Sequence, residues 1–270
     1  MARASIGKLS AVLGVLAITL ATLAWYEVIP GGWTLRGWIV PHAIRQAQEQ
    51  AQRSRARLAL FRTDNPSVPP GAVVFLGSST IERFPLAEMF PGRPVVNRGI
   101  GNETAGELLQ RLDASLPQAA PAAAVLYGGS LDFRRERCQP EVTRRRVARI
   151  VDELRARYPG LPIALIGLLS EWDFAPARVR DLAATNLALA QLARDADLTF
   201  VATDRPPITT PAGQLARPCS ADRLHLGSEG YRHLARWLIE AGGKVGDLLA
   251  PVSEPTGLES DGTDRAKRDT

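Results

Sequence analysis

Residues 72–80, AVVFLGSST, place a short and continuous apolar run directly before a glycine and two serines. Four further short apolar runs follow along the chain, at 94–96, 122–127, 162–168 and 198–202. Runs of this length that are rich in valine, isoleucine, leucine and aromatic residues are typical of strands buried on both faces. The sequence therefore predicts five such strands, the first of which ends just before the two serines.

Helical patterns alternate with these runs, over 104–116, 140–158, 176–195 and 228–241. In the second of these helices Pro140 stands at the first position, and apolar residues recur at helical spacing. This alternation predicts an α/β fold with three layers, α/β/α, in which helices cover both faces of a parallel sheet of about five strands. Ligands of such sheets bind beyond the carboxyl ends of the strands, so we expect the chemistry in the segments that follow the apolar runs.

The first 30 residues form a predicted signal anchor. Arg3 and Lys8 precede an uncharged run at 9–26, which is long enough to cross a bilayer as a helix and ends in two aromatic residues. This pattern predicts a transmembrane segment over 1–30 that holds the rest of the chain outside the cytoplasm, in the periplasm or an equivalent compartment. A cleaved signal peptide is the alternative, and the protein would then be secreted.

The remaining chain divides into three predicted parts. Residues 31–69 are interpreted as a juxtamembrane stalk, with a basic helix over 42–61 followed by a turn-rich linker. Residues 70–250 form the predicted α/β domain. Residues 251–270 lack apolar content, and we expect them to be disordered.

Composition argues against several classes of function. The net charge is +5, but the arginines are scattered along helical stretches without a nucleic-acid-binding motif, so we expect no nucleic-acid partner. No glycine-rich phosphate loop with a lysine occurs, and the sequence implies no cofactor. The two cysteines, Cys138 and Cys219, lack the spacing of metal ligands, and no metal site is predicted. In an oxidising compartment they could form a disulfide with each other.

The first candidate site is the segment Gly77-Ser78-Ser79-Thr80, directly after the first predicted strand. A serine on a strand-to-helix turn has an exposed hydroxyl, and the backbone N–H groups of such a turn can stabilise an oxyanion. The Gly-x-Ser-x-Gly pattern of the α/β-hydrolase elbow is not met, because Ile81 occupies the last glycine position. Taken alone, the segment is also compatible with an ordinary helix N-cap.

The second candidate site is Asp222 with His225, in a predicted loop before the last helix. An aspartate at this spacing can accept a hydrogen bond from one imidazole nitrogen, which fixes the tautomer and leaves the other nitrogen free to take a proton from a serine. An exposed loop histidine without a function is the alternative.

Four blocks of sequence together resemble the SGNH, or GDSL-like, hydrolase family. They are Ser79 after the first strand, VVNRGIGNET at 95–104, LYGG at 126–129 and DRLHLGSEGY at 222–231. The similarity covers about residues 70–245. It implies a flavodoxin-like three-layer domain that hydrolyses or transfers acyl groups of esters or thioesters. It also implies roles for three residues: Ser79 as the nucleophile, His225 as the general base and Asp222 as the residue that orients it.

The chain departs from this family at three positions. Ser78 stands where the first block usually has an aspartate, outside the three relay groups. Asn102 stands at the glycine whose backbone N–H, together with that of Ser79, forms the family's oxyanion hole; asparagine keeps this N–H and tolerates a left-handed backbone. Leu131 replaces the asparagine of the third block, so one side-chain donor is expected to be lost, and Ser130 is a candidate to replace it.

These observations lead to one expected function and two alternatives. We expect a membrane-anchored serine esterase or deacylase that acts on an acyl ester of a lipid, a glycan or a small molecule. An acyltransferase that uses the same serine is the first alternative. A non-catalytic descendant of the fold that binds glycans or envelope polymers is the second, and Leu131 is the residue that motivates it.

Overall fold

The computed structural model describes residues 14–23 and 42–251, and the predictions made for 1–13, 24–41 and 252–270 lie outside these residues. The chain forms two compact units, one that ends at Ala56 and one that starts at Arg57. The second unit contains the five strands of the described chain. The α/β domain predicted over 70–250 lies within this second unit.

A parallel sheet of five strands forms the middle of the second unit, with the strand order β2-β1-β3-β4-β5 that is typical of flavodoxin-like folds. The strands are β1 (Val73–Gly77), β2 (Val95–Gly99), β3 (Ala123–Tyr127), β4 (Ile163–Ile166) and β5 (Thr199–Val201). The predicted parallel sheet is confirmed. The three central strands are buried along their whole length, but β2 and β5 are partly exposed because each has a neighbouring strand on one side only.

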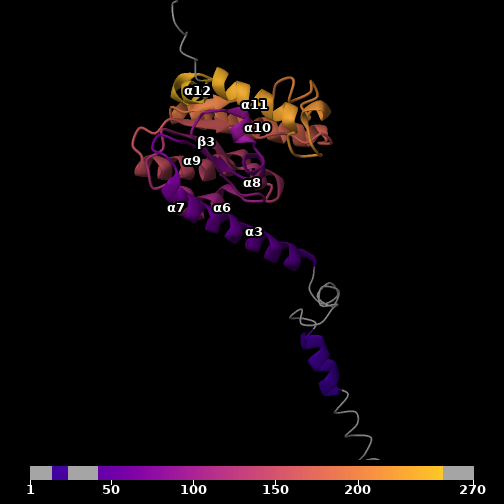
Figure 1. Ribbon diagram of the computed structural model, residues 1–270. Coiled ribbons are helices and arrows are strands. Elements are labelled where there is room, and N and C mark those ends of the chain that lie inside the picture. The colour runs from indigo at the N-terminus through magenta and orange to yellow at the C-terminus, as the bar shows by residue number, and fades with distance from the viewer. Residues whose placement is uncertain (1–13, 24–41, 252–270) are drawn as a thin grey trace, which may run out of the picture. The chain divides into compact units, whose positions relative to one another are not determined.

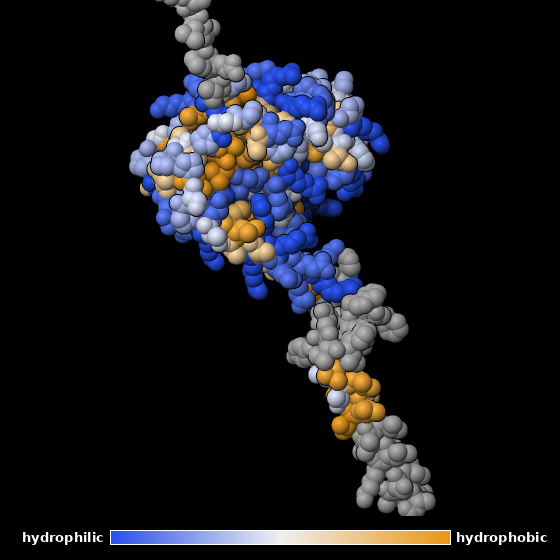
Figure 2. Space-filling model, viewed as in Figure 1, coloured by the Kyte–Doolittle hydropathy of each residue, from blue (hydrophilic) through white to orange (hydrophobic). Residues whose placement is uncertain are grey.

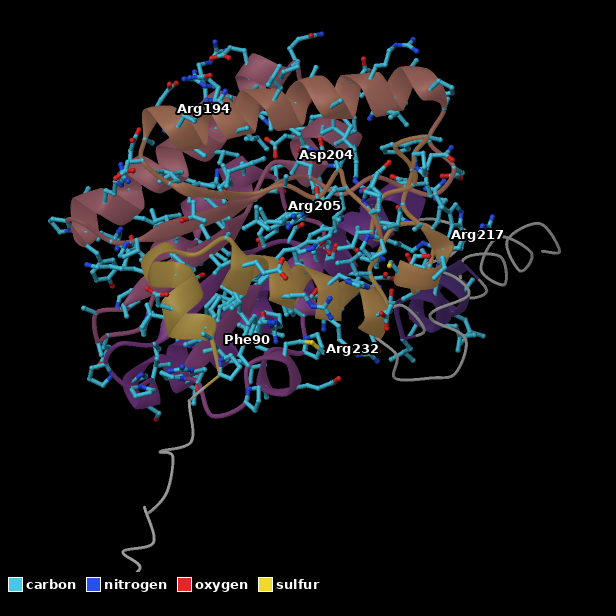
Figure 3. All side chains as sticks on the ribbon, turned by 90° about the horizontal axis from the view of Figure 1, so that it is seen from above. Phe90, Arg194, Asp204, Arg205, Arg217 and Arg232 are labelled. Atoms are coloured by element: carbon cyan, nitrogen blue, oxygen red, sulfur yellow. The ribbon has the colours of Figure 1, made fainter. Side chains whose placement is uncertain are left out.

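Helices cover both faces of the sheet and give the three layers (Figures 1 and 3). On one face α6 (Ala105–Gln110) and α10 (Pro176–Asp195) pack against α9 (Pro140–Arg157). On the other face α11 (Ser228–Glu240) packs against α5 (Leu86–Met89) and α12 (Gly243–Leu249). Of the residues labelled in Figure 3, Phe90 is buried in the core, whereas Arg194, Arg217 and Arg232 are exposed.

The helix boundaries follow local sequence signals. Both α9 and α10 begin with a proline, which fits the first turn because its missing N–H would have no helical partner there. The predicted helix over 104–116 is instead two pieces, α6 and α7 (Leu112–Ser115), interrupted at Arg111. Short helices that the sequence pattern did not predict, because they are too short to show a helical period, are α4 (Ser79–Glu82), α5, α8 (Ser130–Arg134) and α12.

The N-terminal unit is described over 14–23 and in the first part of α3 (His42–Asp64). Residues 14–23 are helical and apolar, and Val15, Leu16 and Ile18 are exposed (Figure 2). They are the described part of the run at 9–26 that the sequence predicts to be an anchor. No helix within the described ranges is both long enough and apolar enough to cross a membrane.

The core of the second unit yields a prediction about stability. Leu126 lies in the central strand β3 and is fully buried, whereas Leu187 on α10 is 66% exposed. We expect Leu126→Ala to lower the free energy of unfolding by about 2–5 kcal/mol, because it removes buried methyl groups and leaves a cavity. Leu187→Ala is the matched control and should change it by less than about 0.5 kcal/mol. Urea denaturation of both variants tests this, and similar losses in the two would contradict the assigned core.

Candidate active site

Ser79 is the first residue of α4, two residues after β1 ends at Gly77. The N-cap position of this helix belongs to Ser78, whose side chain makes no capping hydrogen bond. The Ser79 side chain is partly exposed and lies against a histidine ring, so its surroundings are those of a reactive hydroxyl and not of an N-cap.

The structure brings the hydroxyl, the imidazole and the carboxylate of the predicted relay together. His225 Nε2 lies 3.1 Å from Ser79 Oγ. On the other side of the ring, Nδ1 lies 2.9 Å and 2.8 Å from the two carboxylate oxygens of Asp222. A hydrogen on Nδ1 donated to this carboxylate leaves Nε2 as the acceptor for the serine hydroxyl, which is the tautomer that the network favours. The His225 side chain is 12% exposed and the Asp222 side chain is 47% exposed.

Several donors converge on the carboxylate of Asp222. The backbone N–H groups of Leu224 and His225 each donate to Oδ1 at 2.8 Å, and Arg83 donates to Oδ2 at 3.3 Å. Partial desolvation opposes ionisation of this carboxyl group, but the hydrogen bonds from Leu224 and His225 outweigh it and hold the pKa of Asp222 below its usual range. The group that faces the imidazole is therefore a stable anion.

Two backbone N–H groups are available beside Ser79. Neither Ser79 N–H nor Asn102 N–H donates a hydrogen bond to another group of the described residues. Asn102 has a φ of 61°, so it adopts the left-handed conformation that a glycine would adopt without cost. For other residues this conformation costs about 1–2 kcal/mol, and asparagine is among those that visit it most readily. The turn at Asn102 therefore keeps its backbone geometry without the glycine.

The residues that follow β3, Ser130 and Leu131, offer no free side-chain donor to the site. Leu131 is half-buried in the first turn of α8 and offers no polar atom. Ser130 is buried, and its Oγ lies 3.3 Å from Ser78 Oγ. The candidate substitute donor therefore already has a hydrogen-bond partner, the residue next to Ser79.

Several supporting residues were not identified from the sequence. Glu82, one turn after Ser79, accepts a hydrogen bond from Gly101 N–H at 2.9 Å. Tyr231 donates from its hydroxyl to Thr80 O at 2.9 Å and is buried, and burial raises the pKa of its phenol. Tyr231 lies within the fourth block quoted above, but the motif gives no indication of which backbone group its hydroxyl contacts.

The two cysteines are not bonded to each other, so the disulfide that the sequence allowed is not formed. The Cys219 thiol is buried and contacts Pro207 O at 3.3 Å. The Cys138 thiol is half-buried and contacts Glu136 Oε2 at 3.8 Å. Each thiol thus has its own partner: Cys138 lies in the loop between α8 and α9, and Cys219 ends the 3-10 helix η2 (Arg217–Cys219).

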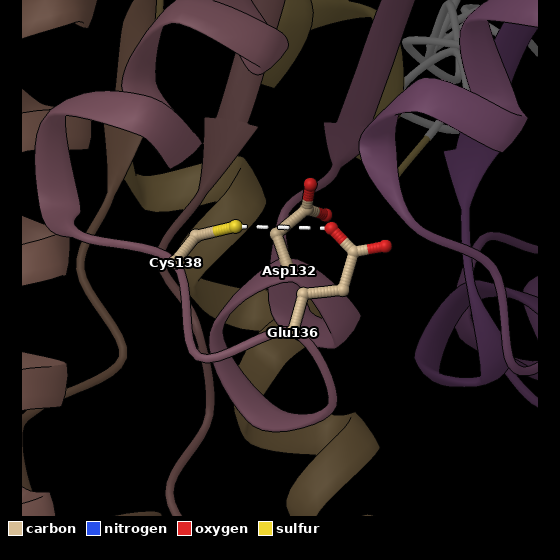
Figure 4. Close-up of side chains that lie close together, drawn as sticks. All are labelled: Asp132, Glu136 and Cys138. Carbon is tan, nitrogen blue, oxygen red and sulfur yellow. Dashed lines mark hydrogen bonds between the residues drawn. The ribbon is translucent and has the colours of Figure 1, made fainter.

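Cys138 also lies beside two carboxylates, in the only group of potential metal ligands found among the described residues (Figure 4). Its members are Asp132, Glu136 and Cys138. Both carboxylates are already paired with Arg146, and Asp132 also accepts a hydrogen bond from Ala105 N–H at 2.8 Å. The guanidinium of Arg146 thus occupies the position between the two carboxylates and offsets part of their negative charge. The group is best described as an ion-pair network that joins α8, α9 and the start of α6.

A comparison with family models matches residues 75–233 of the chain to the GDSL-like lipase/acylhydrolase family. The matched segment includes the Ser79, Asn102 and His225 positions described above. A comparison with curated proteins gave no match.

Solved structures share the fold. A protein of Streptococcus pneumoniae, named as a platelet activating factor, is 26% identical, with a TM-score of 0.66 and coverage of 73% of this chain and 97% of that chain. An acylhydrolase of Bacteroides fragilis is 20% identical, with a TM-score of 0.60 and coverage of 70% and 96%. A GDSL-like lipase of Bacteroides thetaiotaomicron is 19% identical, with a TM-score of 0.57 and coverage of 71% and 96%. At these identities the two Bacteroides proteins support the fold alone.

The depressed pKa of Asp222 predicts how stability depends on pH. The unfolded chain binds a proton at this carboxyl near its ordinary pKa of about 3.9, before the folded protein does. The stabilisation from Asp222 is thus fully present above that pH and shrinks as the pH falls below it. We expect Asp222→Asn to be less stable than the wild type at pH 5, with a difference that narrows toward pH 3. Urea denaturation between these pH values measures it, and a difference that widens would contradict the assigned shift.

Proposed function

Because the chain belongs to the GDSL-like lipase/acylhydrolase family, we propose that it is a serine esterase that cleaves acyl esters with Ser79, His225 and Asp222. The observation that carries this proposal is the continuous line of contacts from Ser79 Oγ through the His225 ring to the Asp222 carboxylate. A nucleophile, a base within hydrogen-bond reach and a third group that orients the base are the arrangement that activates a serine hydroxyl.

The proposed reaction has two steps. In the first, Ser79 Oγ attacks the ester carbonyl carbon while His225 Nε2 takes the hydroxyl proton, and the alcohol leaves with that proton as the acyl-enzyme forms. In the second, water attacks the acyl-enzyme, His225 takes a proton from the water and returns it to Ser79 Oγ, and the acid is released. Asp222 remains ionised and stabilises the imidazolium, and the N–H groups of Ser79 and Asn102 receive the charge on the carbonyl oxygen.

The substrate is proposed to lie near a membrane or in the cell envelope. The apolar run at 9–26, which follows Arg3 and Lys8, supports an uncleaved anchor that holds the domain outside the cytoplasm. The exposed apolar side chains of the helix at 14–23 fit this proposal. A tethered esterase would act on lipids or on acylated envelope polymers within reach of its anchor.

A covalent label tests the proposed nucleophile. We expect a fluorophosphonate to label the wild-type protein at Ser79, as located by peptide mass spectrometry, and to leave Ser79→Ala unlabelled. His225→Ala should lower the rate of ester hydrolysis by at least about 10³-fold, because the serine loses its base. Ser67→Ala and His233→Ala are matched controls of the same residue types and should keep the wild-type rate. Labelling at another serine, or hydrolysis that survives Ser79→Ala, would contradict the proposal.

Leu131 favours a second candidate function, a domain that binds acylated polymers and turns them over poorly. Loss of one oxyanion donor typically lowers turnover by about 100- to 1,000-fold. If the site is an impaired esterase, Leu131→Asn should raise kcat by at least about 10-fold with little change in KM, because the restored donor acts in the transition state. Steady-state kinetics with a p-nitrophenyl ester measures this. Turnover that stays at background in both proteins would favour the binding function.

A further inference from the structure

Side chains hold the loop that carries Asn102 at the residues just before Asn102. Gly101 N–H donates to Glu82 Oε2 at 2.9 Å, and Gly99 O accepts a hydrogen bond from the Arg57 guanidinium at 3.0 Å. Arg57 Nε also lies 3.6 Å from Glu82 Oε1. The side chains of one ion pair thus hold the backbone at Gly99 and at Gly101, which lead to the candidate oxyanion donor Asn102.

The loop is also held on the side that follows Asn102. Glu103 is 7% exposed and pairs with Arg111, whose Nε lies 2.6 Å from its carboxylate. Burial raises the pKa of Glu103, and the charge and hydrogen bond of Arg111 oppose this shift. Arg111 also donates to Gly77 O at 3.2 Å, two residues before Ser79. The second ion pair therefore connects the Asn102 loop to the nucleophile turn.

Both ion pairs meet at one aromatic ring of α3. Phe61 is 2% exposed, and the guanidinium carbons of Arg57 and Arg111 lie 5.1 Å and 6.0 Å from its centroid. A third guanidinium, that of Arg98, lies 4.9 Å away and pairs with Asp64 at the end of the same helix. Contacts of this kind between guanidinium groups and aromatic rings are favourable when they are desolvated. The last turns of α3 are thereby fixed against the site.

The residues that α3 contributes to these contacts lie outside the segment that the family model matches. Arg57, Phe61 and Asp64 precede the matched residues 75–233, and Arg57 reaches the backbone at Gly99, three residues before Asn102. Asn102 adopts a left-handed backbone without being glycine, so its turn needs support from its surroundings to keep this conformation.

We infer that Arg57, acting through Glu82, is a positioning residue for the Asn102 N–H, and that α3 from Arg57 to Asp64 is part of the catalytic unit. The inference rests on the proposed function, because its consequence is read as ester turnover at Ser79. Arg57 touches neither substrate nor relay. Its effect is to hold the donor where charge develops in the transition state, so it should act on kcat more than on KM.

Kinetics per active site in the full chain test this inference. We expect Arg57→Ala and Glu82→Ala each to lower kcat at least 10-fold while KM changes less than about 3-fold, with concentrations of active sites taken from fluorophosphonate titration. The double variant should lose no more than about the larger of the single losses, because both changes remove the same support. Arg57→Lys should retain most of the wild-type kcat. Arg62→Ala is the matched control, since Arg62 is an exposed arginine of the same helix, and it should retain the full rate.

The outcomes separate this inference from the proposed function. A wild-type protein that neither reacts with the label nor turns over ester contradicts the proposed function itself. An active wild type whose kcat per active site is unchanged in Arg57→Ala overturns the inference alone, even if that variant is less stable in urea. Multiplying losses in the double variant would also overturn it, because Arg57 and Glu82 would then act separately.

Discussion

The parallel pairing of β1 with both β2 and β3 determines where the site lies. In this register Gly77 lies opposite Gly99 on one side and Tyr127 on the other. Ser79, Asn102 and Ser130 each follow within three residues of these strand ends, so they emerge at one edge of the sheet. The approach is closest at Gly99, where a Cβ atom would lie 2.1 Å from Glu82 N. The absence of a side chain there lets the nucleophile helix pass over the end of β2.

The relay depends on a second constraint, the closure of the loop before α11. Ala221 N–H donates to His225 O at 2.9 Å, and Ser220 and Leu226 form an isolated bridge, so the loop is nearly closed on itself. Tyr231 then ties α11 to Thr80 in the nucleophile helix. Within this loop, the carboxylate of Asp222 accepts hydrogen bonds from the backbone N–H groups of Leu224 and His225. The acid and the base are therefore oriented mostly by local contacts, and only the hydroxyl comes from a distant part of the chain.

The difference between contacts within a short segment and contacts between distant segments explains what the sequence could predict. The strands, the long helices and the relay have signals over a few consecutive residues: buried runs, helical periods, and an aspartate three residues before a histidine. The Arg57–Glu82 and Arg111–Glu103 pairs have no such signal, because one arginine among many cannot be matched to its partner until the fold brings them together. The sequence could not predict the free thiols for the same reason. The contacts of Cys138 and Cys219 depend on how the chain folds around each of them. The short helices α4 and α8 fall below the length at which a helical period can be recognised.

In the proposed oxyanion site, a side-chain donor is the one element that a substitution can remove. The N–H groups of Ser79 and Asn102 belong to the backbone and are kept whichever side chain is present, provided that the turn keeps its shape. Leu131 has no polar side-chain atom at the position where the resemblance implies an asparagine, so it can offer no such donor. A site that relies on backbone donors alone depends more heavily on how firmly those donors are held. Two ion pairs hold this turn: Arg57–Glu82, which is partly exposed, and Arg111–Glu103, which is buried. In the proposed reaction, the missing side-chain donor at Leu131 and the support from α3 therefore affect the stabilisation of the same oxyanion.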